Sequence, residues 1–271
     1  MKARIHFLLI KNTLYKEYRN KTLLLLFLFT LLILWLDQTF FDFIFNQFFK
    51  AQNLNLIQYK LDLFYYIISS WNILISALLG VSCVKSDRDE GVLEGLLSLP
   101  ISRLSYVLSR IFGTWLIVIG YYVLSLLLAI TVFSFDGLQG QFLGWPILSS
   151  LLMSSLPILI VITLSVFFSL HFSRVWALIT TLFLTGIISH ANETFSGRFL
   201  DQVSNIDGPY KAIIALIHSL IPHSGTFNTL SKELFGNHEL TKSLTLELLH
   251  FSGSYALLIF AVMITFRQKG P

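Results

Sequence analysis

The sequence predicts an all-helical membrane protein with six spanning helices. Hydrophobic residues make up 55% of the 271 residues and charged residues only 13%, about half the charged share of ordinary soluble domains. The mean hydropathy is +0.72. A soluble protein of this length could not bury so much apolar surface in one core, so a lipid bilayer is the expected solvent. The apolar runs are continuous rather than alternating, which favours helices over a β-barrel.

Six apolar runs are long enough to cross a bilayer, which takes about 20 residues in a helix. The first run follows a basic leader, as the apolar core of a signal peptide does. It is longer than the usual core of about 7–15 residues, and no small-x-small cleavage site follows, so we predict an uncleaved helix. The predicted single domain covers 1–271, with spans at 22–45, 61–84, 106–133, 146–170, 175–190 and 244–266.

The lysines and arginines predict the orientation of these spans. Placing the N-terminus inside puts 13 of the 19 basic residues in inner segments and six in outer segments. Because cytoplasmic loops carry the excess of positive charge, both termini are expected in the cytoplasm. The 13 are Lys2, Arg4, Lys11, Lys16, Arg19, Lys21, Lys85, Arg88, Arg103, Arg110, Arg174, Arg267 and Lys269.

Segments 1–21 and 191–243 are not expected to span. In 1–21 apolar and basic residues alternate at helical spacing, which predicts an amphipathic helix on the inner membrane face. This helix would be either an anchor that contacts phospholipid or a connecting helix that bears on a partner. In 191–243 we predict a re-entrant or interfacial helix over 210–221, and a second short helix capped by Asn228 or Thr229 and closed by Gly236.

Between the second and third spans lies a charged, amphipathic inner segment. Three acids at 87, 89 and 90 are expected at a helix start, where carboxylates favour the helix dipole. Pro100 would end this helix, and Ser102 would cap the next one. The segment is either a solvated loop with arginines at its base or a coupling helix that docks into a cytoplasmic motor. The candidate docking residues are Asp87, Asp89, Glu90, Gly91, Glu94, Leu96, Leu97, Pro100 and Arg103.

The run D-x-x-x-G-x-L-E-x-L-L-S-x-P-I-S-R, from Asp87 to Arg103, resembles the segment after the second span in ABC transporter permeases of the export type 2 family. The multicopper-enzyme-maturation and haem-export permeases are similar. The amphipathic start, the six spans and the stretch L-I-P-H-S-G-T-F-N before the last span extend the resemblance over the whole topology. One departure is the very short inner loop at 171–174, which leaves room for only a small second docking contact.

This resemblance implies a non-enzymatic subunit that works as a homo- or heterodimer in a bacterial inner membrane. A separate ATPase would dock at the coupling helix and bind ATP and magnesium. The chain itself has no G-x-x-x-x-G-K-[ST] loop, so the ATPase activity is expected on the partner. The resemblance names no substrate, and it does not decide whether the pair exports a solute.

Several other residues could take part in chemistry or binding. The single cysteine, Cys83, excludes an intramolecular disulfide, and the basic residues flank apolar runs as membrane topology requires, which argues against nucleic-acid binding. A polar set deep in the second span, Ser69, Asn72 and Ser76, could line a pathway or hold helices together. Histidines and one glutamate near the outer face could bind zinc, although their spacing differs from H-E-x-x-H; they are His190, Glu193, His218 and His223.

Three alternatives to an exporter subunit remain at this stage. One is a subunit that transmits motion to an outer, periplasmic partner, which the apolar stretch 210–237 motivates. Another is an intramembrane metal-dependent enzyme that uses the outer histidines. The third is a passive channel or scaffold that needs no nucleotide.

Overall fold

The computed structural model describes residues 2–19, 24–33, 35–36, 39, 56–97, 101–135, 145–194, 208–235 and 243–269. Helices and the turns between them account for all of these residues, and no strand occurs among them. The helices are α1 (Lys2–Arg19), α3 (Leu56–Asp89), α4 (Val92–Leu97), α5 (Arg103–Phe135), α6 (Trp145–Ser169), α7 (Arg174–Thr194), α9 (Gly208–Leu220), α10 (Ser224–Phe235) and α11 (Leu244–Lys269).

Five of the six expected spans are confirmed as helices long and apolar enough to cross a membrane. They are Tyr65–Asp89, Arg103–Leu128, Leu148–Ser169, Arg174–Ala191 and Leu244–Gln268. The first expected span, at 22–45, is described mainly over the apolar helix Leu24–Ile33, which is too short by itself to cross. The rest of that run lies largely outside the described residues, so the six-span layout stays a prediction.

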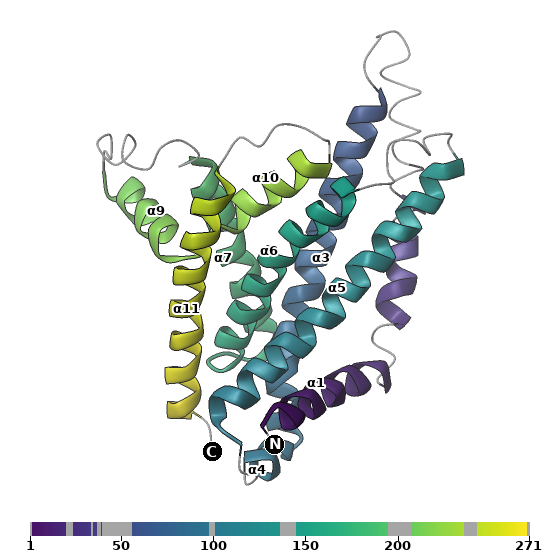
Figure 1. Ribbon diagram of the computed structural model, residues 1–271. Coiled ribbons are helices and arrows are strands. Elements are labelled where there is room, and N and C mark those ends of the chain that lie inside the picture. The colour runs from purple at the N-terminus through teal and green to yellow at the C-terminus, as the bar shows by residue number, and fades with distance from the viewer. Residues whose placement is uncertain are drawn as a thin grey trace.

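The long helices lie side by side, and short elements close the two ends of the bundle (Figure 1). Helix α1 runs across one end, beside α4 and both ends of the chain. We call this the junction end. Helices α9 and α10 lie at the opposite end, which we call the α10 end. The amphipathic N-terminal helix expected over 1–21 is confirmed as a helix at Lys2–Arg19.

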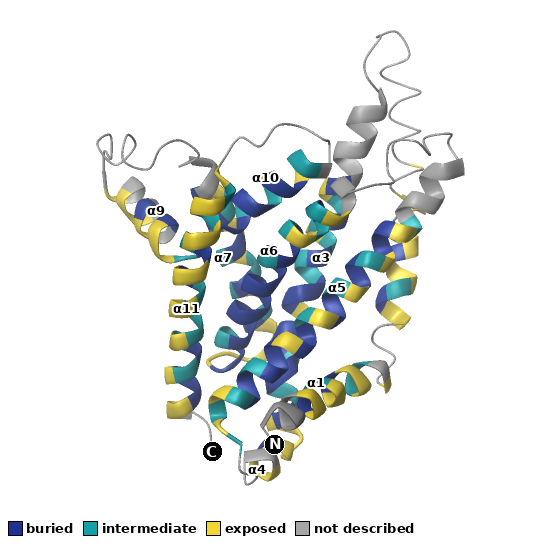
Figure 2. Ribbon diagram, in the orientation of Figure 1, coloured by how far each residue is buried: buried dark blue, intermediate teal, exposed yellow. Residues whose placement is uncertain are grey.

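Helices α3 and α6 form the centre of the bundle, and α11 lies at its margin. The described spans of α3 and α6 are the most buried, whereas that of α11 is mostly exposed (Figure 2). Gly80 allows the close approach of α3 to α6, because a Cβ added there would lie 2.7 Å from the Cβ of Ser165 and 3.0 Å from the Cα of Ile162. Membrane helices pack closely at small residues, so this contact fixes α3 against α6.

Two short helices at the α10 end lie in the segment 191–243, and their re-entrant or interfacial placement stays a prediction. Helix α9 matches the expected 210–221 and is followed by Pro222. The expected cap at Asn228 or Thr229 is wrong, because α10 begins at Ser224 and both residues lie inside it. The helix starts this early because the turn at Pro222 already directs the chain into it, with the Phe227 amide donating to the His223 carbonyl. The expected closing residue Gly236 lies outside the described residues.

Helix α10 is packed into the bundle. Phe227 and Leu230 are fully buried, and the Ser231 hydroxyl lies between the hydroxyls of Ser150 and Ser154 on α6. Ser231 also donates to the Ser150 carbonyl at 2.8 Å. Polar groups in an apolar bundle need such partners, so the serines hold α10 in one register against α6.

Candidate functional site

The charged segment between α3 and α5 differs from its expected shape. Helix α3 continues to Asp89, so Asp87 and Asp89 lie in its last turn and not at the start of a new helix. Carboxylates at a helix C-terminus interact unfavourably with the helix dipole. The expected favourable dipole contact is therefore wrong, and cations from other elements must offset these two charges.

A sharp turn separates α3 from the short helix α4. Gly91 has φ of +70°, in the left-handed region that glycine adopts without strain. Leu93 is buried against the core, whereas Val92, Glu94 and Gly95 are exposed. Helix α4 thus rests on the bundle by one side and presents the other at the junction end.

The predicted cap of the next helix is confirmed. The Ser105 amide donates to the Ser102 hydroxyl at 3.1 Å, and the Tyr106 amide donates to the Ser102 carbonyl. This is the N-cap arrangement that satisfies free amides at a helix start. Arg103 then opens α5, and its guanidinium donates to the Arg267 carbonyl near the end of α11.

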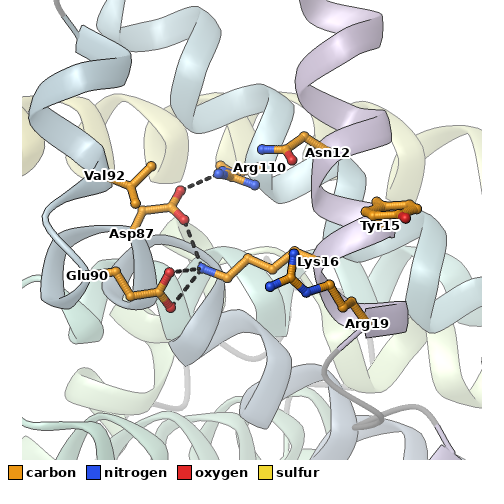
Figure 3. A pocket seen from close by; sticks show the side chains of 8 residues that line it. All are labelled: Asn12, Tyr15, Lys16, Arg19, Asp87, Glu90, Val92 and Arg110. Carbon is orange, nitrogen blue, oxygen red and sulfur yellow. Dashed lines mark hydrogen bonds and ion pairs between the residues drawn. The ribbon is translucent and has the colours of Figure 1, made fainter.

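A buried ion pair lies directly above the turn. Asp87 and Arg110 form an ion pair, with both side chains only 2% exposed. The Tyr106 hydroxyl donates to the same carboxylate at 2.6 Å. Lys16 Nζ on α1 lies 3.1 Å from its other oxygen, as Figure 3 shows beside the pair with Arg110. A buried carboxylate is stable only with partners of this kind.

Three further contacts hold helix α1 beside this pair. Lys16 Nζ also donates to both oxygens of Glu90 at 3.1 Å and to the Ser86 hydroxyl at 3.0 Å. Arg110 donates to the Thr13 hydroxyl at 2.8 Å. Elements 70 or more residues apart in the chain therefore meet at one polar cluster. We call it the polar junction: Thr13, Lys16, Asp87, Glu90, Tyr106 and Arg110.

A second, exposed contact joins the same turn to the loop between α6 and α7. Arg174 at the start of α7 donates to Asp89 at 2.6 Å, with both side chains about half exposed. The Lys85 ammonium also donates to the Phe172 carbonyl. The short inner loop at 171–174 thus contacts the end of α3.

Burial also affects the acid next to Lys16. Burial of Glu17 raises the pKa of its carboxyl above the ordinary value, while the positive charges of Lys16 and Arg110 pull the pKa back down. The charge of Glu17 is therefore a small unfavourable contribution to the packing of α1.

The predicted docking residues lie in different environments. Asp87 is buried in the polar junction, and Asp89 and Glu90 are partly exposed and paired with Arg174 and Lys16. Glu94 is exposed on α4. Leu96 and Leu97 belong to α4 without a described side-chain environment, and Pro100 lies outside the described residues.

Sequence reasoning missed the basic half of the polar junction. Arg110 was interpreted only as a positive charge at a helix base, yet it lies two turns inside α5 and is 1% exposed. A cation at that depth destabilises the protein unless it has an acidic partner. This cost was the one signal in the sequence that could have predicted a buried partner for Arg110. Nothing in the sequence indicated that its partners are Asp87 and Thr13, because those pairings depend on how α1 and α3 pack.

Two members of the polar set in α3, Asn72 and Ser76, bond within their own helix. Asn72 is buried, and its amide donates to the Ile68 carbonyl at 2.9 Å, while the Ser76 hydroxyl donates to the Asn72 carbonyl. Ser69 is half-buried one turn earlier. Within the part of the chain described, Asn72 Oδ1 has no hydrogen-bond partner. The pathway assignment of this set stays a prediction.

At the α10 end, histidines gather in a stack and not around a shared centre. The rings of His218 and His223 lie 4.0 Å apart and nearly parallel, and those of His223 and His250 lie 3.9 Å apart. His223 Nδ1 lies 2.7 Å from the Glu247 carboxylate, and Nε2 lies 2.8 Å from the His218 carbonyl. We call His218, His223, His250 and Glu247 the histidine stack.

The histidine stack brings together only two of the residues weighed for zinc. His218 and His223 belong to it, while His190 is exposed on α7 and the side chain of Glu193 is not described. Stacked rings point their nitrogens outward in their own planes, so they do not converge on one ion. Among the described residues, no group of three or more histidine, cysteine or acidic side chains could hold a metal ion.

Comparison with known proteins assigns neither a family nor a function to this chain. No family model matches the chain, and neither a curated protein nor a solved structure shows significant similarity to it. The fold and the polar junction therefore carry the functional interpretation.

Proposed function

We propose that this chain is the membrane-spanning permease subunit of an ATP-driven exporter. The observation that carries the proposal is α4, a short helix displayed between two spans at the junction end. The turn between α3 and α4 is joined to α1 by the Lys16–Glu90 ion pair and to α7 by the Asp89–Arg174 ion pair. A helix in this position can transmit the movement of a bound partner to the helices joined to it.

The ion pairs would spread that movement over several helices. Asp87 fixes the end of α3 to α5 through Arg110, so movement of the α3–α4 turn would carry α1, α3 and α5 together. Packed helices respond by rigid-body shifts rather than by continuous deformation. In this proposal the chain transmits energy and performs no chemistry of its own.

The proposed assembly contains a second permease subunit and a separate ABC ATPase that binds ATP and magnesium. Each permease would cross a bacterial inner membrane six times, counting the apolar segment that begins at Leu24, with the junction end in the cytoplasm. Exposed apolar side chains on α11, among them Leu249 and Phe260, provide surface for lipid or for the second subunit.

The decisive experiment is a pull-down of the tagged chain from its native host in mild detergent, with partners identified by mass spectrometry. We expect a stoichiometric cytoplasmic ATPase. Glu94→Lys with Leu97→Asp should insert normally and lose that ATPase. The matched control is Glu233→Lys on α10, the same charge reversal at the opposite end, which should retain it. Absence of any nucleotide-binding partner, or ATPase retention in the double variant, would contradict the proposal.

The second candidate is a subunit that transmits motion to an outer partner without moving a solute. Helix α9 favours it, because Ile213, Leu216 and Leu220 are exposed at the α10 end. Replacing all three by serine should release an outer protein from the pull-down while the ATPase stays bound. If no outer protein is present in the parent pull-down, this candidate fails.

A further inference from the structure

A cavity of about 290 Å³ lies next to the polar junction. The proposed function does not name a molecule that would occupy it. This volume is at the lower end of the range for small-molecule sites. Its floor is buried, since Asp87 and Arg110 are each about 1% exposed, and its rim includes the exposed Tyr15 and Arg19. It is therefore an open pocket with a polar, desolvated base (Figure 3).

The charges in this pocket leave a surplus of one cation. Lys16 and Arg110 are paired with Glu90 and Asp87, which leaves Arg19 as the excess charge. Arg19 forms no ion pair within the described part of the chain, and it lies one turn from Lys16 on α1. Two cations this close on a helix repel each other, so an anion between them would be favourable.

The pocket also contains donors that the junction does not use. Asn12, Tyr15 and Arg19 follow one another at i, i+3 and i+7, so they share a face of α1 that lines the cavity. Amide, phenol and guanidinium donors around one excess positive charge suit the oxygens of a phosphate.

Apolar surface continues from the pocket along the same helix. Leu8 is one turn before Asn12 on that face and is 54% exposed, and Leu24, Leu25 and Leu28 are exposed in the apolar segment that follows α1. An amphipathic helix of this kind lies at the boundary between headgroups and acyl chains. A phosphate that carries acyl chains would satisfy both the donors and the apolar surface.

We propose that this pocket binds the phosphate of a membrane phospholipid at the junction end, with Arg19, Asn12 and Tyr15 as its donors. The lipid would join α1 to the bundle where the polar junction already does. The proposal is independent of the exporter assignment, because it concerns lipid binding by the isolated chain and needs no ATPase.

The test is thermal unfolding of the full chain in detergent micelles titrated with phosphatidylglycerol. We expect a saturable rise in Tm. Arg19→Gln should weaken the apparent affinity about tenfold, as expected for loss of a charge-assisted hydrogen bond. Lys11→Gln is the matched control, since it removes the same charge from an exposed position on α1 outside the pocket. It should change the affinity less than about twofold.

Two further probes separate the sources of the phosphate. Diacylglycerol has the acyl chains without the phosphate, and glycerol phosphate has the phosphate without the chains; neither should raise Tm. Stabilisation by diacylglycerol equal to that by phosphatidylglycerol would overturn the phosphate assignment. Saturation by glycerol phosphate at the same concentration would overturn the lipid assignment. Equal affinities of Arg19→Gln and the parent would overturn the site.

Discussion

The polar junction and the histidine stack hold opposite ends of the bundle together by different physics. The polar junction joins residues 13–16, 87–90 and 106–110 through charges that are largely buried. The histidine stack joins α9, α11 and the turn between α9 and α10 through parallel rings and one acidic partner. The first arrangement is held mainly by paired charges, whereas the second is held mainly by stacked rings.

The kind of contact is the main difference. At the junction end, oppositely charged side chains are buried together, and separating such a pair leaves an uncompensated buried charge. At the α10 end, His223 contacts a carboxylate and a carbonyl and stacks between two other rings. The junction end is therefore held mainly by paired charges, and the α10 end by stacked rings with two polar contacts.

Breaking the buried pair should have the largest effect. Asp87→Asn leaves Arg110 buried without a counter-charge and should destabilise the protein by about 3–5 kcal/mol, measured as Tm and as the yield of monodisperse protein. Asp89→Asn is the control, because its pair with Arg174 is exposed and should contribute at most about 1 kcal/mol. Equal Tm losses in the two variants would show that the polar junction is not what stabilises this end.

Changing the histidine stack should have a smaller effect. His223→Gln loses the contact with Glu247 and both ring stacks, at an expected cost of about 1–3 kcal/mol. Hydrogen exchange should show the loss locally, as faster exchange in α9 and α10 with α1 unchanged. His190→Gln, on the exposed side of α7, should leave exchange at the α10 end as it is. Faster exchange in α1 would contradict the separation of the two ends.

The close contact of α3 with α6 at Gly80 gives a reference for the size of the two effects above. Gly80→Ala places a Cβ 2.7 Å from the Ser165 Cβ and 3.0 Å from the Ile162 backbone, and a clash of this kind costs about 1–3 kcal/mol. Helix propensity returns about 1 kcal/mol, so a net loss near 1 kcal/mol is expected in Tm measurements. At Gly186 an added Cβ meets nothing within 4 Å, so Gly186→Ala should not destabilise. A stabilising Gly80→Ala would mean that α3 and α6 separate easily.

The smallest effect is expected at Glu17, and it depends on pH. Because burial raises the pKa of this carboxyl in the folded protein, its charge opposes folding at neutral pH. As pH falls through the raised pKa, the folded protein takes up a proton that the unfolded chain does not yet bind, so the penalty shrinks and is gone once the pH lies below the ordinary carboxyl value of about 4.3. The Tm advantage of Glu17→Gln over the parent should therefore shrink on acidification. A constant advantage from pH 7 to pH 4.5 would exclude this cause.

The sequence by itself determined the spans and several local features. Continuous apolar runs of bilayer length leave a chain little choice but helices, which is why five spans were predicted close to their observed bounds. Ser102 was predicted as a cap because a cap depends only on neighbouring residues. Helix α9 followed from an apolar stretch with Pro222 after it, again a local signal.

Only the tertiary structure decided the polar junction. Asp87, Asp89 and Glu90 were expected to open a helix and to face a partner, but α3 extends past the apolar run because Lys16, Arg110 and Arg174 offset the acids at its end. Those cations come from three other elements, and no local pattern records which helix lies beside which. Buried charge needs a specific partner, and that partner is selected by packing across the whole chain.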